Sequence, residues 1–85
     1  MKISDFKIRF NLAVHDYKEN RPAKDEWSAL AAAKKQGLCL IDRFPPKIIV
    51  HQIILASLRP DIQDDAAEVA YLGLIPWWKR SFVRI

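Results

Sequence analysis

The residues of this 85-residue chain that could carry acid-base, nucleophilic or metal chemistry are few and widely spaced. The only histidines are His15 and His51, and the only cysteine is Cys39. His15 adjoins Asp16, but neighbouring residues of a helix point about 100° apart, so the two would not form an acid-base pair. The histidines and the cysteine follow neither C-x-x-C nor H-x-x-x-H spacing, and the sequence therefore predicts no zinc site.

Other catalytic signatures are also missing from the sequence. A phosphate-binding loop exposes successive backbone N–H groups in a glycine-rich turn, whereas this chain has only Gly37 and Gly73. No serine has the flanking glycines of a G-x-S-x-G motif. The stretch "DIQDD" lacks the glycine and the final glutamate of a calcium loop. We therefore expect a protein that is not an enzyme and that uses no metal, cofactor or small-molecule substrate.

The C-terminal stretch "IPWWKRSFVRI" gathers two tryptophans, a phenylalanine and three cations without an acid. If it is helical, Trp77, Arg80 and Arg84 share one stripe, and Trp78 falls on a second, apolar stripe. Tryptophan and arginine are enriched among the residues that dominate binding energy at interfaces. Trp77, Trp78, Arg80 and Arg84 are therefore candidate contacts to a larger protein partner or to a second copy of the chain. The alternative is that both indoles pack in the core.

Nucleic-acid binding is the alternative function. Between Trp27 and Pro60 the chain has five cations and one acid, and the net charge is +4. The candidate phosphate contacts are Lys34, Lys35, Arg43, Lys47 and Lys79, with Trp77 available to stack on a base. A helix-turn-helix is disfavoured because "LCLIDRFPP" is too long for its turn and "IIVHQIILA" is too apolar to read base edges. Protein docking is therefore the main hypothesis.

The first half of the chain predicts two helices. "ISDFKIRFNLAVHDYKEN" fits both a helical apolar stripe and strand alternation, and its length favours the helix. In "NRPAKDEWSALAAAKKQG", Asn20 can cap the helix, Pro22 can open it and Gly37 can end it. Trp27, Leu30 and Ala31 form the expected inward stripe.

The stretch "KIIVHQIILASL", after Pro46, predicts a helix that is apolar on nearly every side. Such a helix is either central or has one side that docks on a partner. "FPPKIIVHQIILASL" resembles the opening helix of an F-box, in which a proline-led aliphatic helix docks on an adaptor, and "LIPWWKRSF" resembles its tryptophan-basic segment. The resemblance covers half of the chain and rests on hydrophobic spacing. It implies that one apolar side faces a partner, without assigning the chain to that family.

The last part of the chain predicts a helix in "DIQDDAAEVAYLG", capped by Asp61 and ended by Gly73, and another helix starting at Pro76. The expected fold is mainly α, a compact single domain over residues 1–85 with four to five short helices. A short two-stranded pairing of "LCLI" with "KIIV" is the alternative for the centre of the chain. With no membrane-length apolar segment and no signal-peptide pattern, a cytoplasmic protein is expected.

Overall fold

The computed structural model describes residues 2–38 and 47–82, with side chains placed as far as Gly73. These residues form helices α1 (Ile3–Asn20), α2 (Glu26–Lys35), α3 (Lys47–Leu58) and α4 (Gln63–Phe82), with a 3₁₀ turn, η1 (Pro60–Ile62), before α4. The prediction of a mainly helical chain is confirmed, and the four to five short helices expected are four among the described residues, two of them long. Within the described ranges there is no strand, so the two-stranded alternative gains no support, and residues 39–41 of "LCLI" lie outside those ranges.

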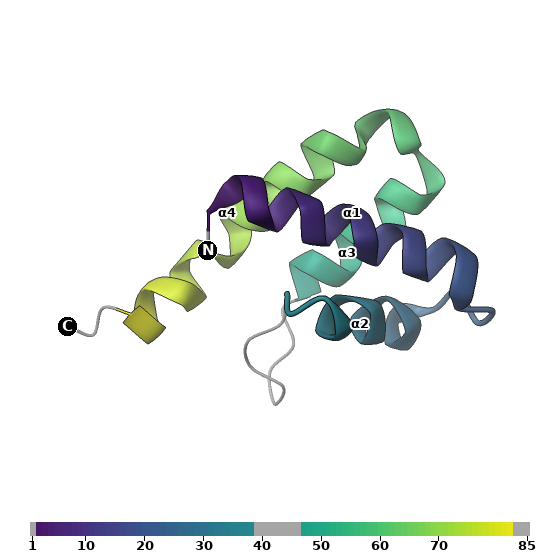
Figure 1. Ribbon diagram of the computed structural model, residues 1–85, viewed down its shortest axis with the longest axis horizontal. Coiled ribbons are helices and arrows are strands. Elements are labelled where there is room, and N and C mark those ends of the chain that lie inside the picture. Colours follow the sequence, from purple (N-terminus) through teal and green to yellow (C-terminus); the bar gives the residue numbers. More distant parts are fainter. Residues whose placement is uncertain (1, 39–46, 83–85) are drawn as a thin grey trace.

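Helix α3 occupies the centre of the bundle and packs against α1, α2 and α4 (Figure 1). Its buried residues include Ile49 and Ile53, both fully excluded from solvent, together with Val50 and Ala56. One side of this helix is therefore used inside the chain, with Ile48 and Ile54 partly buried against the core, whereas Leu58 is 74% exposed. The central position accounts for the buried side, and docking of a partner on the remaining apolar side stays a prediction.

Helices α1 and α4 are joined by an aromatic contact and two polar ones. The rings of Phe6 and Tyr71 meet edge to face with centroids 5.4 Å apart, and Phe10 lies 6.1 Å from Phe6. Lys7 forms an ion pair of 3.3 Å with Asp64. The side chain of Gln63 donates to that of Asn11 over 2.8 Å. The N-terminal half of α1 is thus fixed to the first turns of α4.

Helix α2 turns a different face inward from the one that the sequence predicts. Ala29, Ala32 and Ala33 are completely buried, whereas Trp27 is 78% exposed. Only Leu30 of the expected stripe is buried, and Ala31 is partly exposed. The prediction for Trp27 was wrong because alanines let the α2 backbone lie close to α1 and α3, and an indole would force these helices apart.

The matched substitutions Ala33→Leu and Ala31→Leu test this orientation. Overpacking a filled interior costs about 1–3 kcal/mol, so Ala33→Leu is expected to lower the free energy of unfolding by that amount. Ala31→Leu adds the same atoms on the outer side and is expected to stay within about 0.5 kcal/mol of the original protein. Urea unfolding followed by circular dichroism measures both. Equal losses in the two variants would contradict the observed orientation.

The ends of α2 are set by Asp25 and Gly37. The Asp25 carboxylate accepts a hydrogen bond of 2.8 Å from the Ser28 backbone N–H, so Asp25 is the N-cap in place of the predicted Asn20 and Pro22. At the other end Gly37 has φ of 73°, and the N–H of Leu38 donates to the carbonyl of Ala33 over 2.9 Å. This is the left-handed glycine stop that the sequence predicts.

The connection from α1 to α2 is closed by Lys24, a non-glycine residue with φ of 51°. Its ammonium group donates to the carbonyls of Tyr17 (2.9 Å), Lys18 (2.7 Å) and Arg21, and it lies 5.6 Å from the centroid of the Tyr17 ring. The last carbonyls of α1 are thereby satisfied by a side chain from the turn that follows.

Asp16 is the buried charged residue among the described side chains. Asn20, the last residue of α1, donates to its carboxylate over 2.8 Å, and Arg21 donates through Nε and Nη2, each over 3.0 Å. The hydrogen bond from Asn20 lowers the pKa of Asp16 below its usual 3.8. Burial opposes this shift, while Arg21 and the charge of Lys35 add to it.

The lowered pKa of Asp16 predicts a loss of stability in acid. Because the folded chain holds this carboxylate charged more strongly than the unfolded chain does, its stabilisation is complete above the unfolded pKa and disappears as pH falls through the folded pKa. Asp16→Asn is expected to have a lower free energy of unfolding than the original protein at neutral pH. Its free energy of unfolding is also expected to fall less steeply as the pH drops below about 4. The free energy of unfolding of this variant still depends on pH, because the hydrogen bond from the Ser28 N–H also lowers the pKa of Asp25. Urea unfolding across this pH range measures the difference, and parallel curves for both proteins would contradict it.

Helix α4 does not end where the sequence predicts. Asp61 lies in η1 rather than at the N-cap, Gly73 is an interior residue, and Pro76 also falls inside the helix. A Cβ atom added to Gly73 would lie 3.0–3.3 Å from three carbons of the Ile48 side chain. The glycine is therefore explained by close approach of α3 to α4, and the predicted stop at this position was wrong.

Candidate docking surfaces

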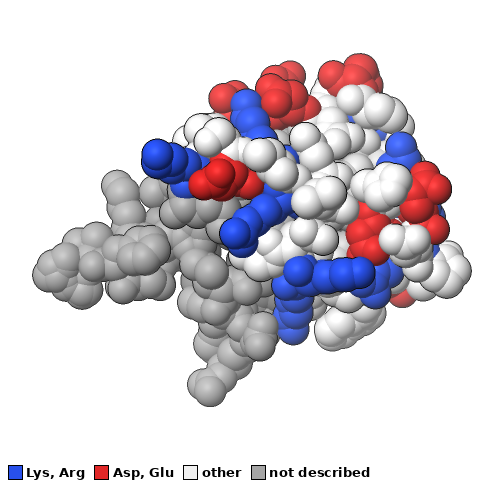
Figure 2. Space-filling view, in the orientation of Figure 1, with Lys and Arg blue, Asp and Glu red and all other residues white. Residues whose placement is uncertain are grey.

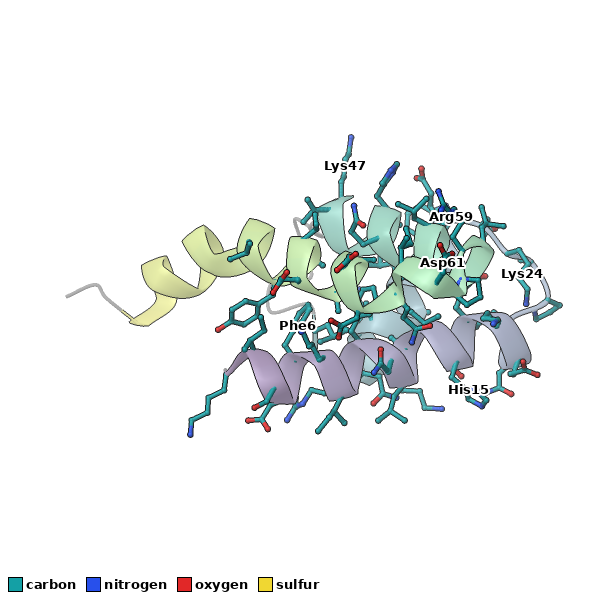
Figure 3. All side chains as sticks on the ribbon, turned by 90° about the horizontal axis from the view of Figure 1, so that it is seen from above. Phe6, His15, Lys24, Lys47, Arg59 and Asp61 are labelled. Carbon is teal, nitrogen blue, oxygen red and sulfur yellow. The ribbon has the colours of Figure 1, made fainter. Side chains whose placement is uncertain are left out.

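The C-terminal half of α4 extends beyond the rest of the bundle. At about 1.5 Å per residue, the 20 residues of α4 span roughly 30 Å, against roughly 18 Å for the 12 residues of α3. Figure 1 shows the end of α4 passing the start of α1 and leaving the bundle, and the perpendicular view in Figure 3 shows the same projection. The four-helix body therefore does not flank the last turns of this helix.

This projecting half contains three of the four predicted protein contacts. Trp77, Trp78 and Arg80 all fall within α4, as does Lys79, while Arg84 lies outside the described residues. Their side chains are beyond the placed ones, so the assignment of the two indoles to separate stripes stays a prediction. By register alone, positions 74, 77 and 78 continue the three- and four-residue spacing of the buried Ala67 and Ala70.

Trp27 is an exposed aromatic residue that the sequence analysis placed in the core. It occupies the second position of α2, with Ala31 and Lys34 one and two turns further along the same side. Two other large apolar residues, Ile8 (60% exposed) and Leu12 (50% exposed), lie one turn apart on α1. The signal for Trp27 was available in the sequence: the three alanines at 29, 32 and 33 define a narrower inward stripe than the indole does.

The predicted phosphate contacts whose side chains the structure describes come from the ends of two helices. Lys34 and Lys35 lie side by side at the end of α2, where Arg9 of α1 approaches and donates to the Gln36 carbonyl over 3.4 Å. Lys47 begins α3, and Figure 3 shows its side chain pointing away from α1 on the opposite side of the molecule. Arg43 lies outside the described residues. Lys34 and Lys35 thus belong to the end of α2 and Lys47 to the start of α3, and a joint phosphate contact through them stays a prediction.

The charged side chains divide unequally between the two ends of the bundle. We call residues 2–9, 34–38, 47–50 and 68–73 the basic end, since they contain six cations and two acids, while a third acid, Asp64, is paired with Lys7 from just outside these ranges. The six cations are Lys2, Lys7, Arg9, Lys34, Lys35 and Lys47, and the two acids are Asp5 and Glu68. The acidic end, residues 15–33 and 51–67, has seven acids and four cations. Figure 2 shows cations over the start of α1 and over α2, with acids along the top and right edges.

The helix arrangement explains why distant segments share the basic end. The Phe6–Tyr71 contact places the start of α1 beside α4, and the Gly73–Ile48 contact places the start of α3 there too. The Arg9–Gln36 hydrogen bond adds the end of α2. Because α4 leaves the bundle beyond Gly73, its projecting half starts from this basic end (Figure 1).

Two of the residues considered for catalysis lie on different helices of the described part of the chain. His15 on α1 and His51 on α3 are both exposed, and Cys39 lies outside the described ranges. Within those ranges, no three side chains of the ligating types gather closely enough to hold a metal ion. None of the helices described here combines the length and apolar character needed to cross a membrane.

Comparison of the chain with protein-family models gives no matching family, and neither the curated proteins nor the solved structures contain a match.

Proposed function

We propose that this chain is a non-enzymatic docking protein that binds a larger protein through the projecting half of α4. The observation that supports this most is the passage of α4 beyond α1 and α3, with Trp77, Trp78, Lys79 and Arg80 in the part that projects. A helix that inserts an apolar stripe into a groove of its partner is a common mode of protein recognition. Tryptophan and arginine supply most of the binding energy where they are anchors.

The regulatory role that we propose for this chain is that of an inhibitor or an adaptor of its partner. A chain of this size that acts by contact can inhibit its partner, or link it to another molecule, without chemistry of its own. The Lys79 and Arg80 positions add positive charge beside the two indoles. Such charges steer the encounter and fix the orientation of the partner more than they raise affinity.

Affinity capture from the source cell, comparing the original chain with Trp77→Ala/Trp78→Ala, tests the proposal. The partner is expected to be retained by the original chain and lost by the double variant. Trp27→Ala is the matched control because it removes an exposed indole from the body of the bundle. Retention of the same partner by the double variant would contradict docking through α4.

Nucleic-acid binding is the second candidate, and the observation in its favour is the cluster of Arg9, Lys34 and Lys35 at the end of α2. Titration of a random-sequence DNA duplex at increasing salt tests it. Phosphate contacts release counterions, so affinity would fall steeply with salt. Absence of binding at low salt would exclude this candidate.

A further inference from the structure

The basic end of the bundle has more positive charge than the helices need for their own stability. Arg9, Lys34 and Lys35 lie near the C-terminus of α2, where cations complement the helix dipole. Lys7 is paired with Asp64. Interactions within the chain therefore account for the positive charges at these four positions.

Lys2 and Lys47 lie at helix N-termini, where a cation opposes the helix dipole. Lys2 is the N-cap residue of α1 and makes no side-chain capping bond, and Lys47 is the first residue of α3, whose first turn has no acid. The N-terminus of a helix has a partial positive charge, so a cation there is unfavourable. Both lysines are exposed, and both lie at the end from which α4 projects.

We infer that the basic end, with Lys2 and Lys47 as its outer contacts, docks an acidic protein segment of the partner that receives α4. This inference rests on the proposed function for the choice of a protein as the partner. The charge complementarity is specific to one end, because the opposite end of the bundle has an excess of acids. An acidic partner is therefore attracted toward the base of the projecting helix and repelled from the far end.

The distribution of charge favours a protein segment over nucleic acid. Lys47 points away from α1, the helix that carries Lys7 and Arg9 (Figure 3). Exposed carboxylates of Asp5 and Glu68 lie among the cations of the basic end. Duplex DNA presents one negative charge per about 1.7 Å of its axis and would bring phosphates against these acids. Separate glutamates and aspartates on a protein can pair with individual cations and avoid the two carboxylates.

The test uses a fluorescently labelled glutamate–tyrosine copolymer as the probe and compares Lys2→Gln/Lys47→Gln with Lys18→Gln/Arg59→Gln. Each variant removes two positive charges, so both have the same net charge, but the second pair belongs to the acidic end. The first variant is expected to bind the copolymer about tenfold more weakly, and the second about as well as the original chain. The first variant is also expected to be equally or more stable to heat, because it removes cations from helix N-termini. A weaker binder that is more stable cannot owe its loss to misfolding.

Equal binding by the two variants would overturn the inference. So would tighter binding of a DNA duplex than of the copolymer, with the same dependence on Lys2 and Lys47, since nucleic acid would then be the ligand. Trp77→Ala/Trp78→Ala, compared with the original chain in affinity capture of the partner, separates the two proposals. Retention of the partner by this variant, together with loss of copolymer binding in Lys2→Gln/Lys47→Gln, would contradict the docking helix and support the basic end. The reverse pattern would keep the helix and remove the basic end.

Discussion

Replacing Phe6 with alanine is expected to lower the free energy of unfolding by about 3–5 kcal/mol, the range for removing a fully buried phenylalanine. Phe6 is completely excluded from solvent, and its ring contacts the rings of Phe10 on α1 and Tyr71 on α4. A chain of this length has a total stability of roughly 4–13 kcal/mol. The substitution therefore removes a large part of the stability and releases α1 from α4.

Thermal and urea unfolding, followed by far-ultraviolet circular dichroism, measure this effect. Phe6→Leu is the matched control, because it keeps most of the apolar volume and loses only the ring contacts; its expected cost is below about 1.5 kcal/mol. Leu72→Ala provides a second control on α4, at a residue that is 59% exposed. A loss below 1 kcal/mol in Phe6→Ala would show that α1 and α4 do not share the observed core.

Local patterns were sufficient to predict the helices whose ends are set by neighbouring residues. The turn at Gly37 needs a positive φ, and only glycine adopts it at no steric cost. The apolar run from Ile48 to Leu58 favoured a helix over the strand alternative for "KIIV", and α3 ends at Leu58 where the sequence indicates. Helix α1 required a choice between two periodicities, and length decided it correctly.

The errors occurred where tertiary contacts decided between local alternatives. Gly73 has the residue type of a helix stop, but the close approach of Ile48 accounts for it and the helix continues. Trp27 was assigned to the inward stripe of α2, whereas the buried side consists of three alanines and Leu30 and the indole is exposed. The contact of Gly73 with Ile48 joins residues distant in sequence, so no local pattern could show it, whereas the alanines at 29, 32 and 33 gave a local signal for the buried side of α2.

The candidate docking surfaces, like the fold, could be predicted from the sequence only in part. The tryptophans of the C-terminal stretch were singled out from composition alone, and the structure adds that their helix passes beyond the bundle. The basic end could not be predicted, because its cations come from α1, α2 and α3 and are interrupted in sequence by acids. The unfavourable positions of Lys2 and Lys47 became visible only once the helix ends were known.

The double variant Trp77→Ala/Trp78→Ala is expected to weaken partner binding by about 30-fold or more. Truncation of an anchor tryptophan typically costs at least about 2 kcal/mol, which corresponds to that factor. Its free energy of unfolding is expected to change by less than about 0.5 kcal/mol, as for residues outside the core. Binding is measured by calorimetry with the captured partner, and stability by urea unfolding.

The two readouts together decide between docking and core packing. Buried indoles would each cost about 3–5 kcal/mol of stability when truncated, so the double variant would then be largely unfolded. Trp27→Ala supplies the reference for an indole exposed on the body, with small effects expected on stability and on binding alike. Because α4 runs on past its neighbours, a loss of affinity without a loss of stability is the outcome that a docking helix requires.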